Sequence, residues 1–268
     1  LHLSVHSFPT RRSSDLGTQA NFVDTLESPD SLGTLVIEQR STNNQQIWTA
    51  SDSTVSDLVD ATTNDDEDVF EMLSTEIENN NVTQTGTVAE GDQVIHQVDA
   101  SGLEGILQTG SLNDLATNTG GDGILSGDNA LSLTVEQTAD STTANQDPNQ
   151  IGSQVLDNAT VLFNEETDNL YVVYDISADT GAAADEEYDA EFTVQDRRLL
   201  NPADDVLVDN SNSEIRSDIY QSVSASFDVA ERTFEFDQDP FNVSAGADQT
   251  FTGTANVAPG SEVTVNVR

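Results

Sequence analysis

Apolar and polar residues alternate along most of this chain, a pattern with a period of two that predicts β-strands. Residues 131–137 show it clearly, because Leu131, Leu133 and Val135 fall on one face with polar residues between them. Strands are expected at residues 32–40, 46–50, 93–98, 131–137, 160–164, 170–176, 187–194, 223–229, 233–236, 241–245, 250–257 and 262–267. Many short strands separated by turn residues predict a mainly β protein built of antiparallel β-sandwiches.

Helical periodicity is weaker and confined to short segments. Apolar residues recur at helical spacing in residues 66–77, and Asn64 with Glu67 suits a capping box at the start of that helix. Residues 55–59 fit a single helical turn, and the polar tetrad 41–44 predicts a turn between two strands. One or two short helices inserted in a β fold are therefore expected.

The length of the chain, 268 residues, exceeds the roughly 100 residues of one such sandwich. We expect a body at residues 17–239 and the start of a second, truncated domain at residues 240–268, with the boundary at Asp239–Pro240. Residues 1–16 differ in composition from the rest and resemble translated sequencing adapter. They are expected to be a non-native leader that is unpacked and unrelated to the fold.

The charge of the chain narrows the classes of function. Lys and Arg together number 8 against 49 Asp and Glu, a formal net charge of −41. A basic surface for nucleic acid cannot be assembled, and an anionic membrane would repel the chain. The basic residues are all Arg, and the absence of Cys excludes disulfides and thiol chemistry.

Such acidity favours a protein of an extreme halophile over an acidic protein of an ordinary organism. Each like-charge repulsion is screened in brine, because the Debye length falls to about 3 Å near molar salt. Apolar residues still occur in regular runs, so the chain has the material of a folded core despite its charge.

Two stretches carry a resemblance to a known family. Residues 33–42 with 47–50 form the first, and residues 243–268, which include Asn-Val-Ala-Pro-Gly-Ser-Glu, form the second. Both resemble haloarchaeal surface glycoproteins of the S-layer type. The resemblance implies immunoglobulin-like sandwich modules and an exported, N-glycosylated chain at the cell surface. It also implies membrane attachment through a C-terminal anchor, which is missing from this fragment.

Catalytic groups are scarce. Outside residues 1–16 the one histidine is His96, which lies mid-strand on the face of Val94 and Val98 and is expected to be packed. No Gly-x-Ser-x-Gly elbow occurs, and pairs of carboxylates arise by chance in so acidic a chain. Trp48 is expected to anchor a sheet face. We therefore predict no catalytic or cofactor-binding residue and no enzyme.

Clusters of acidic side chains could bind a hard cation through their oxygen atoms. The candidate ligands for calcium or magnesium, neither of which is required, are Asp65, Asp66, Asp68, Glu165, Glu166, Asp168, Asp185, Glu186, Glu187 and Asp189. The competing interpretation is a solvated acidic surface. Sequons for N-glycosylation occur at Asn81, Asn158 and Asn242, in that order of preference, and have meaning only if the chain is exported.

The favoured function is a structural component of a cell-surface layer, with self-association or other surface-layer proteins as partners. The alternatives are an exported adhesion module that binds a cation or sugar and, third, a fragment of a secreted hydrolase. A cell-surface location follows from the first two.

Overall fold

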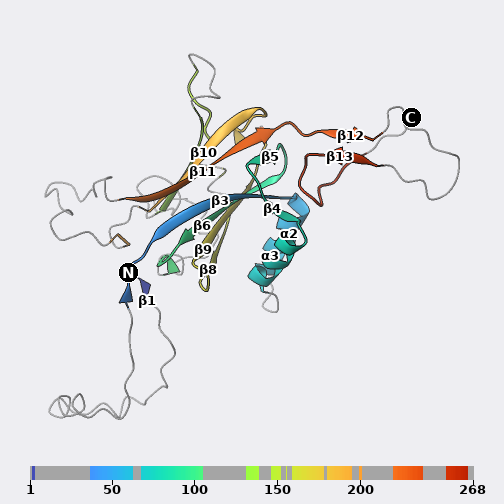
Figure 1. Ribbon diagram of the computed structural model, residues 1–268. Coiled ribbons are helices and arrows are strands. Elements are labelled where there is room, and N and C mark those ends of the chain that lie inside the picture. The colour runs from blue at the N-terminus through green and yellow to red at the C-terminus, as the bar shows by residue number, and fades with distance from the viewer. Residues whose placement is uncertain are drawn as a thin grey trace, which may run out of the picture.

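The computed structural model describes residues 2–3, 37–62, 68–104, 131–138, 146–151, 155, 159–177, 180–194, 199–200, 220–237 and 252–264. Two β-sheets lie face to face in them (Figure 1). The first has the order β4-β3-β6-β9-β8, formed by Val82–Gln84, Thr42–Ala50, Gln93–Ala100, Asn169–Asp175 and Thr160–Asn164. The second has the order β5-β11-β10-β7, formed by Thr87–Ala89, Gln221–Ala230, Glu186–Val194 and Leu131–Gln137. The predicted mainly β sandwich is confirmed, whereas its immunoglobulin-like topology stays a prediction.

Nearly all strand pairs are antiparallel, and β5 with β11 is a parallel pair. The strands predicted at 131–137 and 160–164 are β7 and β8, with the same bounds. The predicted turn at 41–44 is wrong, because β3 begins at Thr42 and continues through it. An irregularity between Thr42 and Asn44 absorbs the extra residue while the pairing with β6 goes on.

The core fills the space between the two sheets because each strand turns its apolar face inward. Val94 and Val98 of β6 meet Leu131 of β7, Phe192 of β10 and Phe227 of β11, all at most 1% exposed. The opposite, outward face of β10 and β11 carries exposed Ser, Asp and Glu side chains. That face is therefore polar and exposed to solvent, whereas the opposite face of the same strands is apolar.

Two helices cover the outer face of the five-stranded sheet (Figure 1). Helix α2 spans Asp52–Thr62, where only one turn was expected. Its buried Val55 and Leu58 join Leu73 of the second helix in an apolar cluster against Ile95 of β6. The helices therefore form a third layer beside the two sheets of the sandwich.

Helix α3 spans Val69–Glu78 and begins later than predicted. The Oδ1 atom of Asp68 accepts hydrogen bonds from the N–H groups of Phe70 (2.9 Å) and Glu71 (3.3 Å), so Asp68 is the cap. The predicted capping residue, Asn64, is therefore wrong. Asp68 competes better because it directly precedes the first helical residue, where its carboxylate reaches two free N–H groups.

Two small ribbons complete the described part of the chain. Strand β1 (His2–Leu3) pairs with β2 (Ile37–Glu38), so two residues of the predicted leader do pair with the chain. Residues 4–16 lie outside the described residues, and the leader as a whole stays a prediction. Strand β12 (Phe234–Phe236) pairs with β13 (Gly253–Ala255) in a ribbon that projects away from the sandwich (Figure 1).

This β12–β13 ribbon joins the two sides of the predicted domain boundary. Asp239 and Pro240 lie outside the described residues, but β12 comes before them and β13 after them. The second domain stays a prediction. Residues 262–264 are not in a strand as expected, and the rest of that predicted strand, like the one at 241–245, is not described.

Candidate functional site

A buried carboxylate lies where the sandwich meets the C-terminal segment. Asp92 follows the tight turn between β5 and β6, in which Gly91 adopts φ +85° and the Asp92 N–H donates to the carbonyl of Ala89 (3.0 Å). The side chain that this turn directs inward is 1% exposed. A buried charge is stable only when donors surround it.

The donors to Asp92 come from two later parts of the chain. The N–H of Ala258 donates to Oδ2 (2.6 Å), and the hydroxyl of Ser261 donates to Oδ1 (3.1 Å). Arg232, from the connection after β11, donates through Nη2 to Oδ1 at 3.1 Å and forms an ion pair. We call this cluster, Asp92 with Arg232 and residues 258–261, the Asp92 junction.

The same C-terminal segment also contacts the start of α2. The hydroxyl of Ser53 donates to the carbonyl of Gly260 (3.2 Å). Gly260 has φ +88°, and a Cβ there would lie 3.0 Å from Oγ of Ser51. Ser51 in turn accepts from the N–H of Thr54 (3.2 Å), which satisfies a free donor of the first helical turn.

The interactions of the Asp92 junction hold segments of the fold together. Oδ1 has two donors and Oδ2 has one, so the carboxylate is engaged from both oxygen atoms. Neither Asp92 nor Arg232 belongs to a sequence motif that predicts a site. The scarcity of Arg in so acidic a chain is the signal that could have found Arg232.

A second buried charge lies at the other end of the β3–β6 strand pair. Arg40 is 2% exposed, and its guanidinium donates to the carbonyls of Ser101 and Ser41 (both 3.2 Å) and to the hydroxyl of Thr42 (2.7 Å). It also donates to the Oε1 atom of Gln221 in β11. Burial lowers the pKa of Arg40 to about 10, so the side chain remains charged at neutral pH.

His96 is packed in the core, as expected, and fully buried. One ring nitrogen, Nε2, lies 2.7 Å from the hydroxyl of Tyr174, and Nδ1 lies 3.1 Å from Nε2 of Gln45. Desolvation lowers the pKa of His96 to about 3 and raises that of Tyr174 well above its ordinary value. A neutral, solvent-excluded imidazole has no route to a substrate, so His96 is a core residue.

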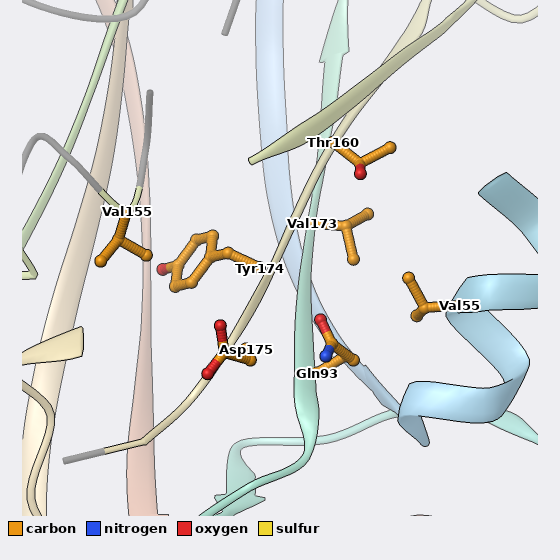
Figure 2. Close-up of a pocket in the computed structure, with 7 residues that line it drawn as sticks. All are labelled: Val55, Gln93, Val155, Thr160, Val173, Tyr174 and Asp175. Atoms are coloured by element: carbon orange, nitrogen blue, oxygen red, sulfur yellow. The ribbon is translucent and has the colours of Figure 1, made fainter. Parts of the chain in front are cut away.

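A pocket of about 330 Å³ opens beside α2 (Figure 2). Its lining residues are Val55, Gln93, Val155, Thr160, Val173, Tyr174 and Asp175. The polar groups at its lower end already have partners: Gln93 donates to Asp52 (3.2 Å), and Asp175 accepts from Ser177 (3.0 Å). In Figure 2 the ring of Tyr174 points away from Val55, so the lining groups do not converge on one point.

The predicted cation ligands lie in separate parts of the fold. Asp68 caps α3, and Glu165, Glu166 and Asp168 lie in the turn between β8 and β9. Within the described part of the chain, no three carboxylates or histidines gather closely enough to hold a metal ion. Asp65 and Asp66 lie outside that part.

The fourth acidic run is divided by its strand. Consecutive residues of β10 point to opposite faces, so Glu186 and Glu187 diverge. Glu186 accepts from Asn149 (3.0 Å) and Tyr188 (2.5 Å), whereas Asp189 accepts from Ser226 (2.6 Å). Asp185 precedes the strand with φ 65°. Glu186 is therefore separated from Glu187 and Asp189, which share the other face of the strand.

Of the predicted glycosylation sites, Asn81 is described and lies between α3 and β4. It is half-buried, and its Nδ2 donates to Oε2 of Glu76 (2.7 Å). Asn158 and Asn242 lie outside the described residues. Trp48 packs against the sheet face under the helices and donates to Gln97 (2.8 Å), as expected of an anchor.

Comparison with known proteins identifies the relatives of the chain. No protein-family model matches it. A cell surface glycoprotein of Haloferax gibbonsii is 36% identical over 262 residues, which is 97% of this chain. Cell surface glycoproteins 1 and 2 of Haloarcula hispanica are 32% and 30% identical over 90% of it.

The chain is a homologue of haloarchaeal cell surface glycoproteins. It spans 27% of the length of the Haloferax relative and 26% of each Haloarcula relative. The resemblance expected from residues 33–42, 47–50 and 243–268 is confirmed. Among the described helices of this surface glycoprotein homologue, none is long and apolar enough to cross a membrane.

Proposed function

We propose that this chain is part of a structural component of the haloarchaeal cell-surface layer, located outside the cell. The homology to cell surface glycoproteins over nearly the whole chain carries the proposal. Two further observations support it. The net charge of −41 suits brine, and the described polar groups serve the fold rather than a reaction.

The experiment is expression of the full-length protein in a haloarchaeal host that lacks its own surface glycoprotein. An antibody against residues 37–104 should label intact cells, and cryo-electron tomography should show a regular layer. Label that is confined to the cell interior contradicts the location. Surface label without a regular layer contradicts the structural role and favours the adhesion module instead.

Self-association is the partner relationship that this role requires. A layer forms only if copies contact one another, and the acidic outward face of β10 and β11 would oppose such contact in dilute buffer. Sedimentation of the full-length protein should therefore show assembly in molar sodium chloride and dispersal at the lowest salt concentration that still supports folding. Monomers at every salt concentration would contradict self-association.

Cation binding is proposed only for Asp65 and Asp66, which come shortly before the cap Asp68 in the sequence. Binding of an ion to the native state would stabilise it by mass action. Millimolar calcium should then raise the unfolding temperature more than sodium at equal ionic strength, and Asp65→Asn with Asp66→Asn should abolish the difference. Equal effects of the two ions leave only a solvated acidic surface.

Modification by N-linked glycan is proposed at Asn81, Asn158 and Asn242. A glycan would replace one of the two hydrogens on Nδ2 of Asn81, and the other hydrogen can keep the bond to Glu76. Mass spectrometry of peptides from protein secreted by a haloarchaeal host tests each site. An unmodified Asn81 in the secreted protein contradicts its use.

A further inference from the structure

The β12–β13 ribbon has little support of its own. All six of its residues are exposed, and a two-stranded ribbon alone is at best marginally stable in water. Its one apolar face holds Phe234 and Phe236, whose rings meet edge to face with centroids 4.9 Å apart. The position of the ribbon therefore depends on the segments that flank it.

Both flanking segments are fastened. Asn256, just after β13, accepts from the N–H of Thr233 (2.8 Å) and donates to the carbonyl of Glu231 (2.7 Å). These bonds hold together the segment that enters β12 and the segment that leaves β13. Residues 258–261 then tie the ribbon to the sandwich through Asp92.

The attachment at Asp92 depends on particular residues of the C-terminal segment. Ala258, 4% exposed, presents its N–H, and Ser261 presents its hydroxyl. Between them Gly260 takes a positive φ that other residues adopt only with strain, and a Cβ at this position would lie 3.0 Å from Oγ of Ser51. Alanine at position 260 would therefore be opposed both by the backbone and by the hydroxyl of Ser51.

The strength of the attachment is also largely independent of salt concentration. Two of the three donors to Asp92 are neutral and belong to the docked segment, so ionic screening does not remove them. Arg232 is the donor with an exposed side chain, at 45%. In molar salt its ion pair weakens, while the two hydrogen bonds of the docked segment remain.

We propose that residues 258–261 are a docking motif, and that Asp92, Arg232 and the first turn of α2 form a socket that holds the β12–β13 ribbon in one fixed orientation relative to the sandwich. The Asp92 junction is then a rigid joint and not a flexible tether. This deepens the proposed function, because a regular layer requires the parts of each copy to keep their relative orientation.

The test measures a distance across the junction. The chain has no Cys, so Ser56→Cys on α2 and Thr254→Cys on β13, both at exposed positions, can carry two spin labels. Double electron–electron resonance in molar sodium chloride should give a single narrow distribution of the distance between the two labels. Asp92→Asn and Gly260→Ala, each in this labelled background, should lose the narrow peak and give a broad distribution.

The matched control is Glu262→Gln, which removes an exposed carboxylate next to Ser261. It should keep the narrow peak. Circular dichroism checks that the sandwich is folded, and if Asp92→Asn unfolds it, Gly260→Ala decides, because that change lies in the docked segment. A narrow, unshifted peak in folded Gly260→Ala overturns the rigid joint, as does a broad peak in the unmutated junction. Neither result bears on cell-surface location, which the labelling of intact cells tests separately.

Discussion

Arg40 and Asp92 are buried charges at opposite ends of the β3–β6 strand pair, and the surrounding structure neutralises them differently. The acceptors that the described residues supply to Arg40 are neutral oxygen atoms, and they lie in or directly beside strands of the two facing sheets. Asp92 instead has an oppositely charged partner, Arg232, and donors from the C-terminal segment.

The two residues therefore have different roles. Arg40 is a brace within the sandwich, and Asp92 is a joint between the sandwich and the β12–β13 ribbon. Arg40 connects the start of β3, the chain after β6 and the start of β11, so its loss should weaken the sandwich itself. Asp92 connects the sandwich to a ribbon that projects from it, so its loss should first free the ribbon. Burial alone, 2% and 1% exposed, does not distinguish the two roles.

Removal of salt should have the largest effect, because it restores repulsion among the acidic groups of the whole chain at once. With a net charge of −41, repulsion in dilute buffer should unfold the protein, and molar sodium chloride should restore the fold by screening. Circular dichroism against sodium chloride concentration measures this. A complete β spectrum in salt-free buffer would contradict the halophilic character.

Substitution of the brace comes next. Arg40→Met should lower the free energy of unfolding by on the order of 3 kcal/mol, because buried acceptors of both sheets lose their donor. Urea unfolding at constant molar salt measures the loss. Asp92→Asn should lower the stability of the sandwich by less, and a reversed order would break the distinction between brace and joint.

Acid should weaken the sandwich through the core that lies between the two ends. The folded pKa of His96 is about 3 and the unfolded one is about 6.5, so the unfolded chain binds the proton first. The contribution of neutral His96 to the free energy of unfolding is complete above pH 6.5. It decreases as the pH falls toward 3, and the loss is about 2 kcal/mol at pH 5. Urea unfolding from pH 7 to pH 5 measures this, and His96→Gln, if folded, should lose this component.

The smallest effect should come from Arg232→Gln. Its side chain is 45% exposed, and an ion pair of that kind contributes below about 1 kcal/mol and is screened by salt. The loss of stability should therefore be measurable at the lowest salt that supports folding and vanish in molar salt. An equal loss at both salt concentrations would show that Asp92 needs its cation as well as its neutral donors.

The elements differ in how far local pattern could predict them. Strands such as β7 and β8 were found with the correct bounds, because alternation is a property of consecutive residues. Helix α2 was predicted only as one turn, since its Ser, Thr and Asp residues weaken the helical pattern. The apolar sheet face that it covers supplies the packing energy that extends it to eleven residues.

The candidate site shows the same limit. Acidic runs such as 185–189 look like ligand clusters in sequence, but a strand sends neighbouring side chains to opposite faces. The group of residues that does come together, Asp92, Arg232 and Ser261, spans 169 positions between its first and last member. No spacing rule connects residues so distant.

By itself the sequence determined the β class, the acidic surface, the packed His96 and the surface-glycoprotein relationship, because composition, alternation and local motifs are carried by neighbouring residues. Only the tertiary structure decided which charges are buried, what neutralises them and where the C-terminal segment docks. Burial and hydrogen-bond partners depend on which distant segments the fold brings together, and a charge changes its energetic role when water is removed from it.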